Sequence, residues 1–143
     1  MDLWTLRYEI YRHVAETGEF PARSALVAMV GDSGLADALL EDMEAHHLVL
    51  LDAAGEIHMA LPFAATDTGH RVSSGNRTWR VNCAWDSLAL PVALGLDAEI
   101  HANWLDTGRP VDLTVRDGQL SSTEGFVHFA VPAARWWDDI IET

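Results

Sequence analysis

The sequence contains no lysine, and each of its nine basic residues is an arginine. The absence of lysine excludes Schiff-base catalysis and the phosphate-binding loops that depend on a lysine. Against nine arginines stand 22 acidic residues, which give a formal net charge of −13. Such a charge argues against a general attraction to nucleic acid or to an anionic membrane.

Cysteine is almost as scarce, because Cys83 is the only one in 143 residues. An internal disulfide and a multi-cysteine zinc site are therefore excluded. No apolar run reaches 18 residues and the N-terminus carries no basic leader, so we expect a cytoplasmic protein with no membrane partner. A hydrophobic content of 49% in a chain of this length is typical of one globular domain or two very small ones.

Residues 1–64 show the pattern of three helices followed by a β-hairpin. Apolar residues at helical spacing predict a first helix that begins near Leu3 and ends at Gly18. A second helix is expected from Pro21 to about Gly31, and a third is expected to begin with Ser33 as its cap and to end at residues 46–47. Residues 48–51 and 56–60 flank a turn and predict two strands. This order is typical of a winged helix-turn-helix module.

Winged helices often bind DNA through a third helix that is rich in Arg, Lys, Asn or Gln. Here the third helix and the wing loop are acidic instead, and the side chains concerned are Asp37, Glu41, Asp42, Glu44, Asp52 and Glu56. Carboxylates would meet the phosphates with the wrong sign of charge. We therefore expect no nucleic-acid partner and interpret residues 1–64 as a winged-helix-like scaffold that covers or positions the rest.

Residues 65–143 are expected to form a second, α+β domain with a small, mainly antiparallel sheet. The predicted strands are 68–72, 78–81, 98–102, 111–116, 119–122 and 126–131. A helix is expected over 83–94, kinked or shortened by Pro91 and ended by Gly95. A short C-terminal helix is expected over 132–141. The whole chain is thus predicted to be α+β.

Cys83 falls where a strand is expected to pass into a helix, and the N-terminus of a helix favours a thiolate. Asp86 lies three residues later, on the same helical face. Burial and repulsion from the thiolate would raise the pKa of this carboxyl, which could then deliver a proton to a leaving group. These residues alone leave two alternatives open. Cys83 could be a buried packing residue, and Asp86 could simply stabilise the helix dipole.

The order Cys-Ala-Trp-Asp-Ser from Cys83 onward resembles the signature of the organomercurial (alkylmercury) lyase family. Further similar segments are 61–72, 107–115 and 127–129. The resemblance implies a winged-helix-like N-terminal region that does not bind DNA. It also implies an enzyme that cleaves carbon–mercury bonds with two cysteines and one aspartate. By this resemblance Cys83 matches the first cysteine and Asp86 the aspartate.

The second cysteine of the family has no counterpart in this chain. When Val127-His128-Phe129 is aligned without a gap, Glu124 stands at its position. One thiolate together with carboxylates binds a two-coordinate soft metal ion only weakly. Three alternatives stay open. The chain is a diverged lyase that cleaves a carbon–heteroatom or carbon–metal bond, a protein that binds a metal or small ligand without turnover, or a transcription regulator.

As a lyase, the protein would act on a small-molecule substrate. Cys83 would be its nucleophile or soft ligand, Asp86 its proton donor and Glu124 an auxiliary carboxylate. Expected to line the substrate pocket are Trp85, Trp104 and His128. The alternatives for these three are core packing of the tryptophans and a surface position for the histidine. No cofactor is expected beyond a soft metal ion at Cys83, for which the sequence does not separate copper, zinc and mercury.

Overall fold

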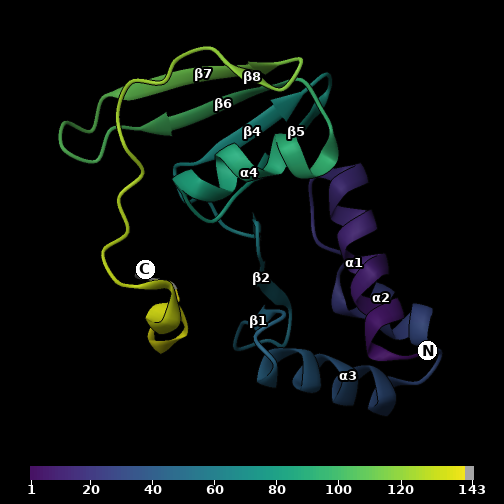
Figure 1. Ribbon diagram of the computed structural model, residues 1–143. Helices are drawn as coiled ribbons and strands as arrows, with labels where there is room; N and C mark the ends of the chain where they lie inside the picture. Colours follow the sequence, from purple (N-terminus) through teal and green to yellow (C-terminus); the bar gives the residue numbers. More distant parts are fainter. Residues whose placement is uncertain (141–143) are drawn as a thin grey trace.

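The chain folds as an α+β protein in a computed structural model that describes residues 1–140. Its helices are α1 (Leu3–Thr17), α2 (Arg23–Val30), α3 (Ser33–Ala45), α4 (Ala84–Leu94) and the 3₁₀ helix η1 (Ala133–Asp138). Its strands are β1 (Leu50–Leu51), β2 (Ile57–Ala60), β3 (Phe63–Ala64), β4 (Arg71–Ser74), β5 (Arg77–Arg80), β6 (Ala98–Asn103), β7 (Pro110–Arg116) and β8 (Gln119–Leu120). The larger sheet with α4 lies at one end of the molecule, and the first three helices lie at the other (Figure 1).

The N-terminal part consists of α1–α3 and a small antiparallel sheet of order β1-β2-β3. Aspartates are the N-cap residues of α1 and α3. The Asp2 carboxylate accepts from the Thr5 N–H, and the Asp32 carboxylate accepts from the Leu35 N–H. The cap of α3 is therefore Asp32 and not the expected Ser33. The sequence also predicted two strands here, and the third, β3, is a short partner of β2. The winged-helix assignment remains an interpretation of this arrangement.

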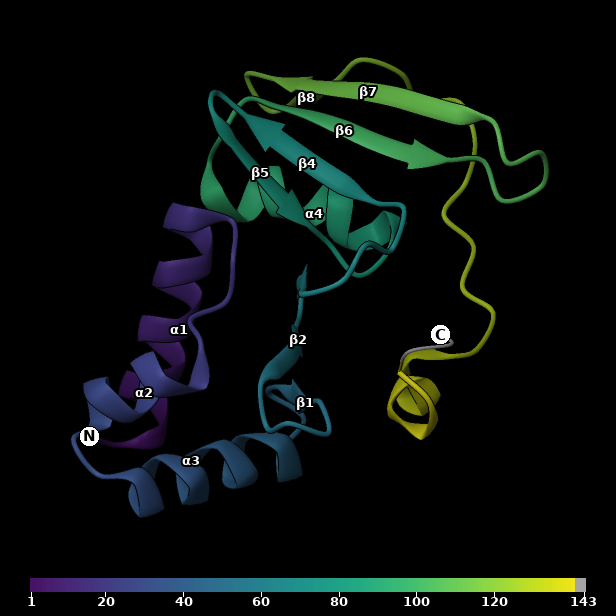
Figure 2. The same cartoon turned by 180° about the vertical axis from the view of Figure 1, so that it is seen from behind.

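The second sheet is antiparallel throughout, with the strand order β5-β4-β6-β7-β8. Helix α4 packs against β4 and β6 and covers one face of this sheet (Figure 2). Alternate residues of the strands, such as Val72, Ile100 and Val115, point into the core beneath α4 and are buried. This alternation fixes the register, since a slip of one residue would turn the apolar face to water.

The two parts of the chain meet where the end of α1 packs against β5. The indole of Trp79, which is 1% exposed, donates a hydrogen bond to the Val14 carbonyl at 2.9 Å. Gly18, the left-handed residue that ends α1, lies so close to β5 that an added Cβ would be 2.5 Å from the Thr78 carbonyl oxygen. Tyr11 and Phe20 pack against the apolar clusters of both parts. The core is therefore continuous from the first helix to the larger sheet. The domain division at residue 64 stays a prediction.

Three expectations for the second half need correction. No strand forms over 126–131, because residues 121–131 make no ladder with the sheet beyond the short β8. The C-terminal helix is a 3₁₀ helix over Ala133–Asp138, and the predicted end at Ile141 lies outside the described residues. Helix α4 is not shortened by Pro91 but continues through it to Leu94, and the Pro91 carbonyl accepts from the Leu96 N–H at 3.0 Å. Within residues 1–140 we find no helix that is long and apolar enough to cross a membrane.

We predict that Gly18→Ala destabilises the protein far more than Gly31→Ala. Both glycines end helices at nearly the same φ, +85° and +84°, but nothing lies within 4 Å of a Cβ at Gly31. An alanine in this left-handed backbone conformation is strained, which alone should lower the free energy of unfolding by about 1 kcal/mol in each variant. The clash with Thr78 should cost Gly18→Ala about 2 kcal/mol more. Urea denaturation measures both. Equal losses would show that a Cβ at Gly18 does not clash with the Thr78 carbonyl of β5.

Candidate functional site

Cys83 and Asp86 are held together at the start of α4. Two residues connect β5 to this point. Val81 forms an isolated antiparallel β-bridge with Phe63, and the Asn82 N–H donates to the Pro62 carbonyl at 3.0 Å. Cys83 is then the extended N-cap residue of α4, and Asp86 stands in its first turn. This spacing corresponds to that of a capping box, in which the side chains of the cap and of the third helical residue lie side by side. The Cys83 thiol donates a hydrogen bond to Asp86 Oδ2 at 3.3 Å.

The thiol at this site is protonated at neutral pH. Burial raises the pKa of Cys83 to about 11, and the negative charge of Asp86 acts in the same direction. The backbone N–H groups of Trp85 and Asp86 lower the pKa, as expected for a helix N-terminus, but they are outweighed. The expectation of a thiolate in the resting protein is therefore wrong, because the site is too poorly solvated for a free negative charge on sulfur.

The carboxyl group of Asp86 is also half-buried, and this burial raises its pKa above the usual range for an aspartate. The hydrogen bond from the Cys83 thiol acts in the opposite direction, since it stabilises the charged carboxylate. The predicted direction of the shift is the one found, and its main cause is desolvation and not repulsion by a thiolate. The Cys83 thiol thus donates its proton into a hydrogen bond whose acceptor is the Asp86 carboxyl oxygen.

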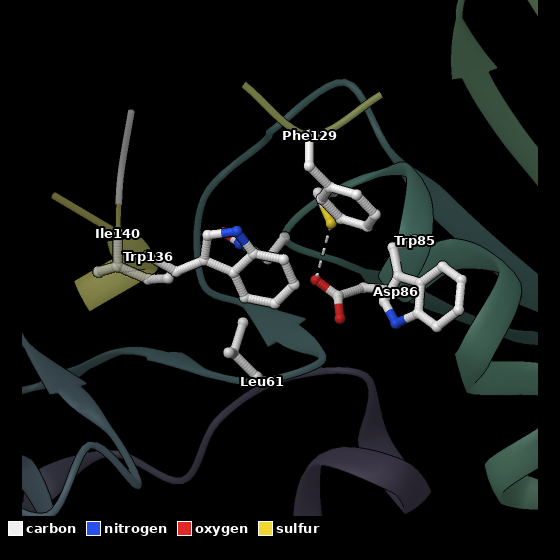
Figure 3. A pocket seen from close by; sticks show the side chains of 8 residues that line it. Leu61, Trp85, Asp86, Phe129, Trp136 and Ile140 are labelled. Carbon is white, nitrogen blue, oxygen red and sulfur yellow. Dashed lines mark hydrogen bonds between the residues drawn. The ribbon is translucent and has the colours of Figure 1, made fainter. Parts of the chain in front are cut away.

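Apolar side chains surround this pair in a small pocket of about 30 Å³. Figure 3 shows the Asp86 carboxylate between Trp85 and Trp136, with Phe129 on a third side and Leu61 on the fourth. The Phe129 ring meets Trp85 at a centroid distance of 6.0 Å and Trp136 at 5.1 Å. The pocket is lined by Leu61, Asn82, Cys83, Trp85, Asp86, Phe129, Trp136 and Ile140. Most of its lining is apolar, which strengthens electrostatic interactions within it.

Of the residues predicted for the site, the structure brings Cys83, Asp86 and Trp85 together. The reasoning from sequence missed Trp136 and Ile140, which reach the pocket from the C-terminal segment (residues 121–140). No local pattern marks them, since their place depends on the path of a segment without strands. Phe129 belongs to a motif that resembles the family, so that motif was the available signal for it.

Glu124, Trp104 and His128 are not among the residues that line the pocket. Glu124 is exposed, and its backbone N–H donates to Ser122 Oγ at 3.2 Å. Trp104 packs instead on the backbone of Gly125, where an added Cβ would be 2.6 Å from the indole ring. His128 is exposed. The predicted strand over 126–131, which would have placed His128 in the sheet, does not form, and both Glu124 and His128 lie at the surface.

The pocket offers few metal ligands. Within the part of the chain that the structure describes, no three His, Cys, Asp or Glu side chains come close enough together to hold a metal ion. Cys83 with Asp86 supplies one soft sulfur and one hard oxygen. Such a pair suits a thiophilic ion of low coordination number far better than zinc, which takes four ligands in structural sites.

The chain is similar to proteins of known family. The family model described as "MerB: Alkylmercury lyase" matches residues 63–143, which is more than half of the chain. A crystal structure of the mercury-bound form of MerB2 is similar, with 25% sequence identity and a TM-score of 0.70. This match covers 85% of the present chain and 59% of the solved one, so the chain spans little more than half the length of that relative. No curated protein matches.

We predict that Cys83 reacts slowly with iodoacetamide at pH 7–8 and faster at each step up to pH 10, since the pKa of the thiol is about 11. All alkylation reports on Cys83, because no other cysteine exists. Asp86→Asn should lower the pKa and raise the rate at pH 8, because it removes a negative charge beside the sulfur.

The control variant is Asp112→Asn, on the exposed side of β7, which should leave the rate unchanged. The chain unfolded in urea should titrate near the ordinary thiol pKa of about 8.5. A rate that is already maximal at pH 7 in the folded protein would contradict a protonated, desolvated thiol.

Proposed function

The chain belongs to the alkylmercury lyase family, and we propose that it cleaves the carbon–mercury bond of a small organomercurial at the Cys83–Asp86 pair. The observation that carries the proposal is the 3.3 Å hydrogen bond from the thiol to the carboxylate in an apolar pocket. Sulfur is the ligand that mercury prefers, and a carboxyl group is a competent proton donor. The two functions needed for the reaction therefore stand side by side.

In the first step the sulfur of Cys83 displaces a ligand X from the substrate R–Hg–X. The thiol proton passes to Asp86 along the existing hydrogen bond, and X leaves as an anion. The products are Cys83–S–Hg–R and a neutral Asp86 carboxyl. Burial favours this neutral form of Asp86, because a charged carboxylate is poorly solvated there.

In the second step Asp86 returns the proton to the carbon bound to mercury. The electron pair of the carbon–mercury bond becomes the new carbon–hydrogen bond, and the hydrocarbon R–H leaves. The Asp86 carboxylate then lies beside Hg(II), which has lost its carbon ligand. Asp86 thus acts first as base and then as acid, and the thiol supplies the proton that ends on carbon.

The single cysteine changes how the product would leave. With one sulfur and one carboxylate oxygen, Hg(II) is held less firmly than between two thiolates. A small thiol from solution would then remove the ion by ligand exchange. We propose that a thiol co-reactant completes the cycle and replaces the second cysteine that this chain lacks.

The N-terminal part has a positioning role in this proposal. Leu61 lines the pocket from the segment between β2 and β3, and His47 at the end of α3 stacks on Trp137 at 4.4 Å. We propose that residues 1–64 act as a scaffold domain for the site, with no nucleic-acid partner.

The second candidate function is binding of a soft metal without turnover, and the lone cysteine favours it.

The cleavage proposal predicts that Asp86→Asn still binds methylmercury but releases methane at least about 100-fold more slowly, since general acids contribute that much or more. Cys83→Ser should lose both binding and cleavage. Headspace gas chromatography measures the methane formed with excess small thiol present, and intact mass spectrometry measures the protein–mercury adduct.

The matched control is Glu124→Gln, which alters an exposed carboxylate outside the pocket and should retain full methane release. Equal methane release by the wild type and Cys83→Ser would refute the lyase mechanism. An adduct on Cys83 without any methane would favour the alternative of metal binding alone.

A further inference from the structure

The pocket beside Cys83 and Asp86 is small for the substrates that it would have to hold. Its volume is about 30 Å³. One water molecule needs roughly 10–15 Å³ on the same scale, and an engineered apolar cavity of about 150 Å³ binds benzene. The space inside the pocket is therefore of the size of a methyl group and is several times smaller than the cavity that holds a benzene ring.

The C-terminal segment sets this size. Phe129, Trp136 and Ile140 close the pocket on the side away from α4 (Figure 3). The Phe129 ring lies between Trp136 and Trp85, so that aromatic contacts run without a break from the segment to α4. A larger organic group inside the pocket would meet these rings.

Several contacts hold this aromatic side in place. Ile140 is 8% exposed, and the Trp136 indole donates to the Val131 carbonyl at 3.1 Å. The adjacent Trp137 stacks on His47 with an angle of 6° between the rings. The segment is thus fastened both to itself and to the end of α3. Displacing the C-terminal segment would lose these packing and ring contacts. Forcing a larger group into the pocket while the segment stays in place would also be unfavourable, because it overpacks the site.

We propose that Phe129 and Trp136 determine specificity by restricting the organic group of the mercurial to the size of methyl. This inference rests on the proposed function, because it takes Cys83 as the atom that binds mercury. Methylmercury bound to Cys83 fits the pocket as it stands. Phenylmercury fits only when Trp136 or Phe129 is made smaller.

The test is a competition for Cys83. Methylmercury and phenylmercury are supplied in equal amounts as their glutathione complexes, and intact mass spectrometry counts the protein that carries each group. The protein has Asp86→Asn as background, so that no adduct is lost to cleavage. The same competition against a short cysteine peptide gives the intrinsic ratio.

Relative to the peptide, the pocket should favour methyl over phenyl by about tenfold or more, the range in which small steric differences in a pocket discriminate. Trp136→Ala should return the ratio most of the way to that of the peptide. Phe129→Ala should act in the same direction and serves as the second variant if Trp136→Ala does not fold by circular dichroism. The control is Trp4→Ala, which removes an exposed indole of α1 and should leave the ratio unchanged.

A ratio equal to that of the peptide, or one that neither pocket variant changes, overturns the inference while methane release still tests the lyase proposal separately. A selective adduct without methane release from the Asp86-containing protein overturns the lyase proposal and keeps the size restriction. The absence of any adduct on Cys83 overturns both.

Discussion

The position of the candidate site depends on how the chain is held between β5 and α4. Trp79 on β5 is fastened to α1 through its bond to the Val14 carbonyl, and Asn82 is fastened to the Pro62 carbonyl two residues beyond β5. Between these two points the backbone has little freedom, and Cys83 follows directly as the extended N-cap residue of α4. The first turn of α4 then places Asp86 beside the sulfur. The contact between the two parts of the molecule thus determines where the pair lies, and the first turn of α4 sets the separation of its side chains.

The electrostatics of the pair follow from its burial. A surface thiol at a helix N-terminus would have a lowered pKa, but here desolvation dominates and keeps the proton on Cys83. A protonated thiol is a poor resting nucleophile, and it becomes useful only with a base in contact. In the proposed mechanism Asp86 is that base, and its own raised pKa makes the same proton available to carbon afterwards. By this proposal the site stores the proton that the reaction needs.

Local patterns in the sequence predicted the elements that have strong local causes. Helical spacing with Gly18 as an end signal predicted α1, and the strands predicted over 111–116 and 119–122 correspond to the β7–β8 hairpin. The Cys83–Asp86 pair could also be predicted, because three residues on a helix set their separation. The aromatic side of the pocket could not. It depends on the C-terminal segment, which has no ladder to fix it and takes its place through long-range contacts such as the stacking of His47 on Trp137.

The central claim is that one thiol and one carboxyl at the start of α4 form a single reactive unit for mercury. A crystal structure of the protein after turnover of methylmercury, with mercury located by its anomalous scattering, tests this claim most directly. Our account predicts one mercury ion in the pocket, bonded to Cys83 Sγ, with an Asp86 carboxylate oxygen as its second protein ligand. Mercury bound to Cys83 with the Asp86 carboxylate turned away, or shared between the Cys83 thiolates of two molecules, would contradict it.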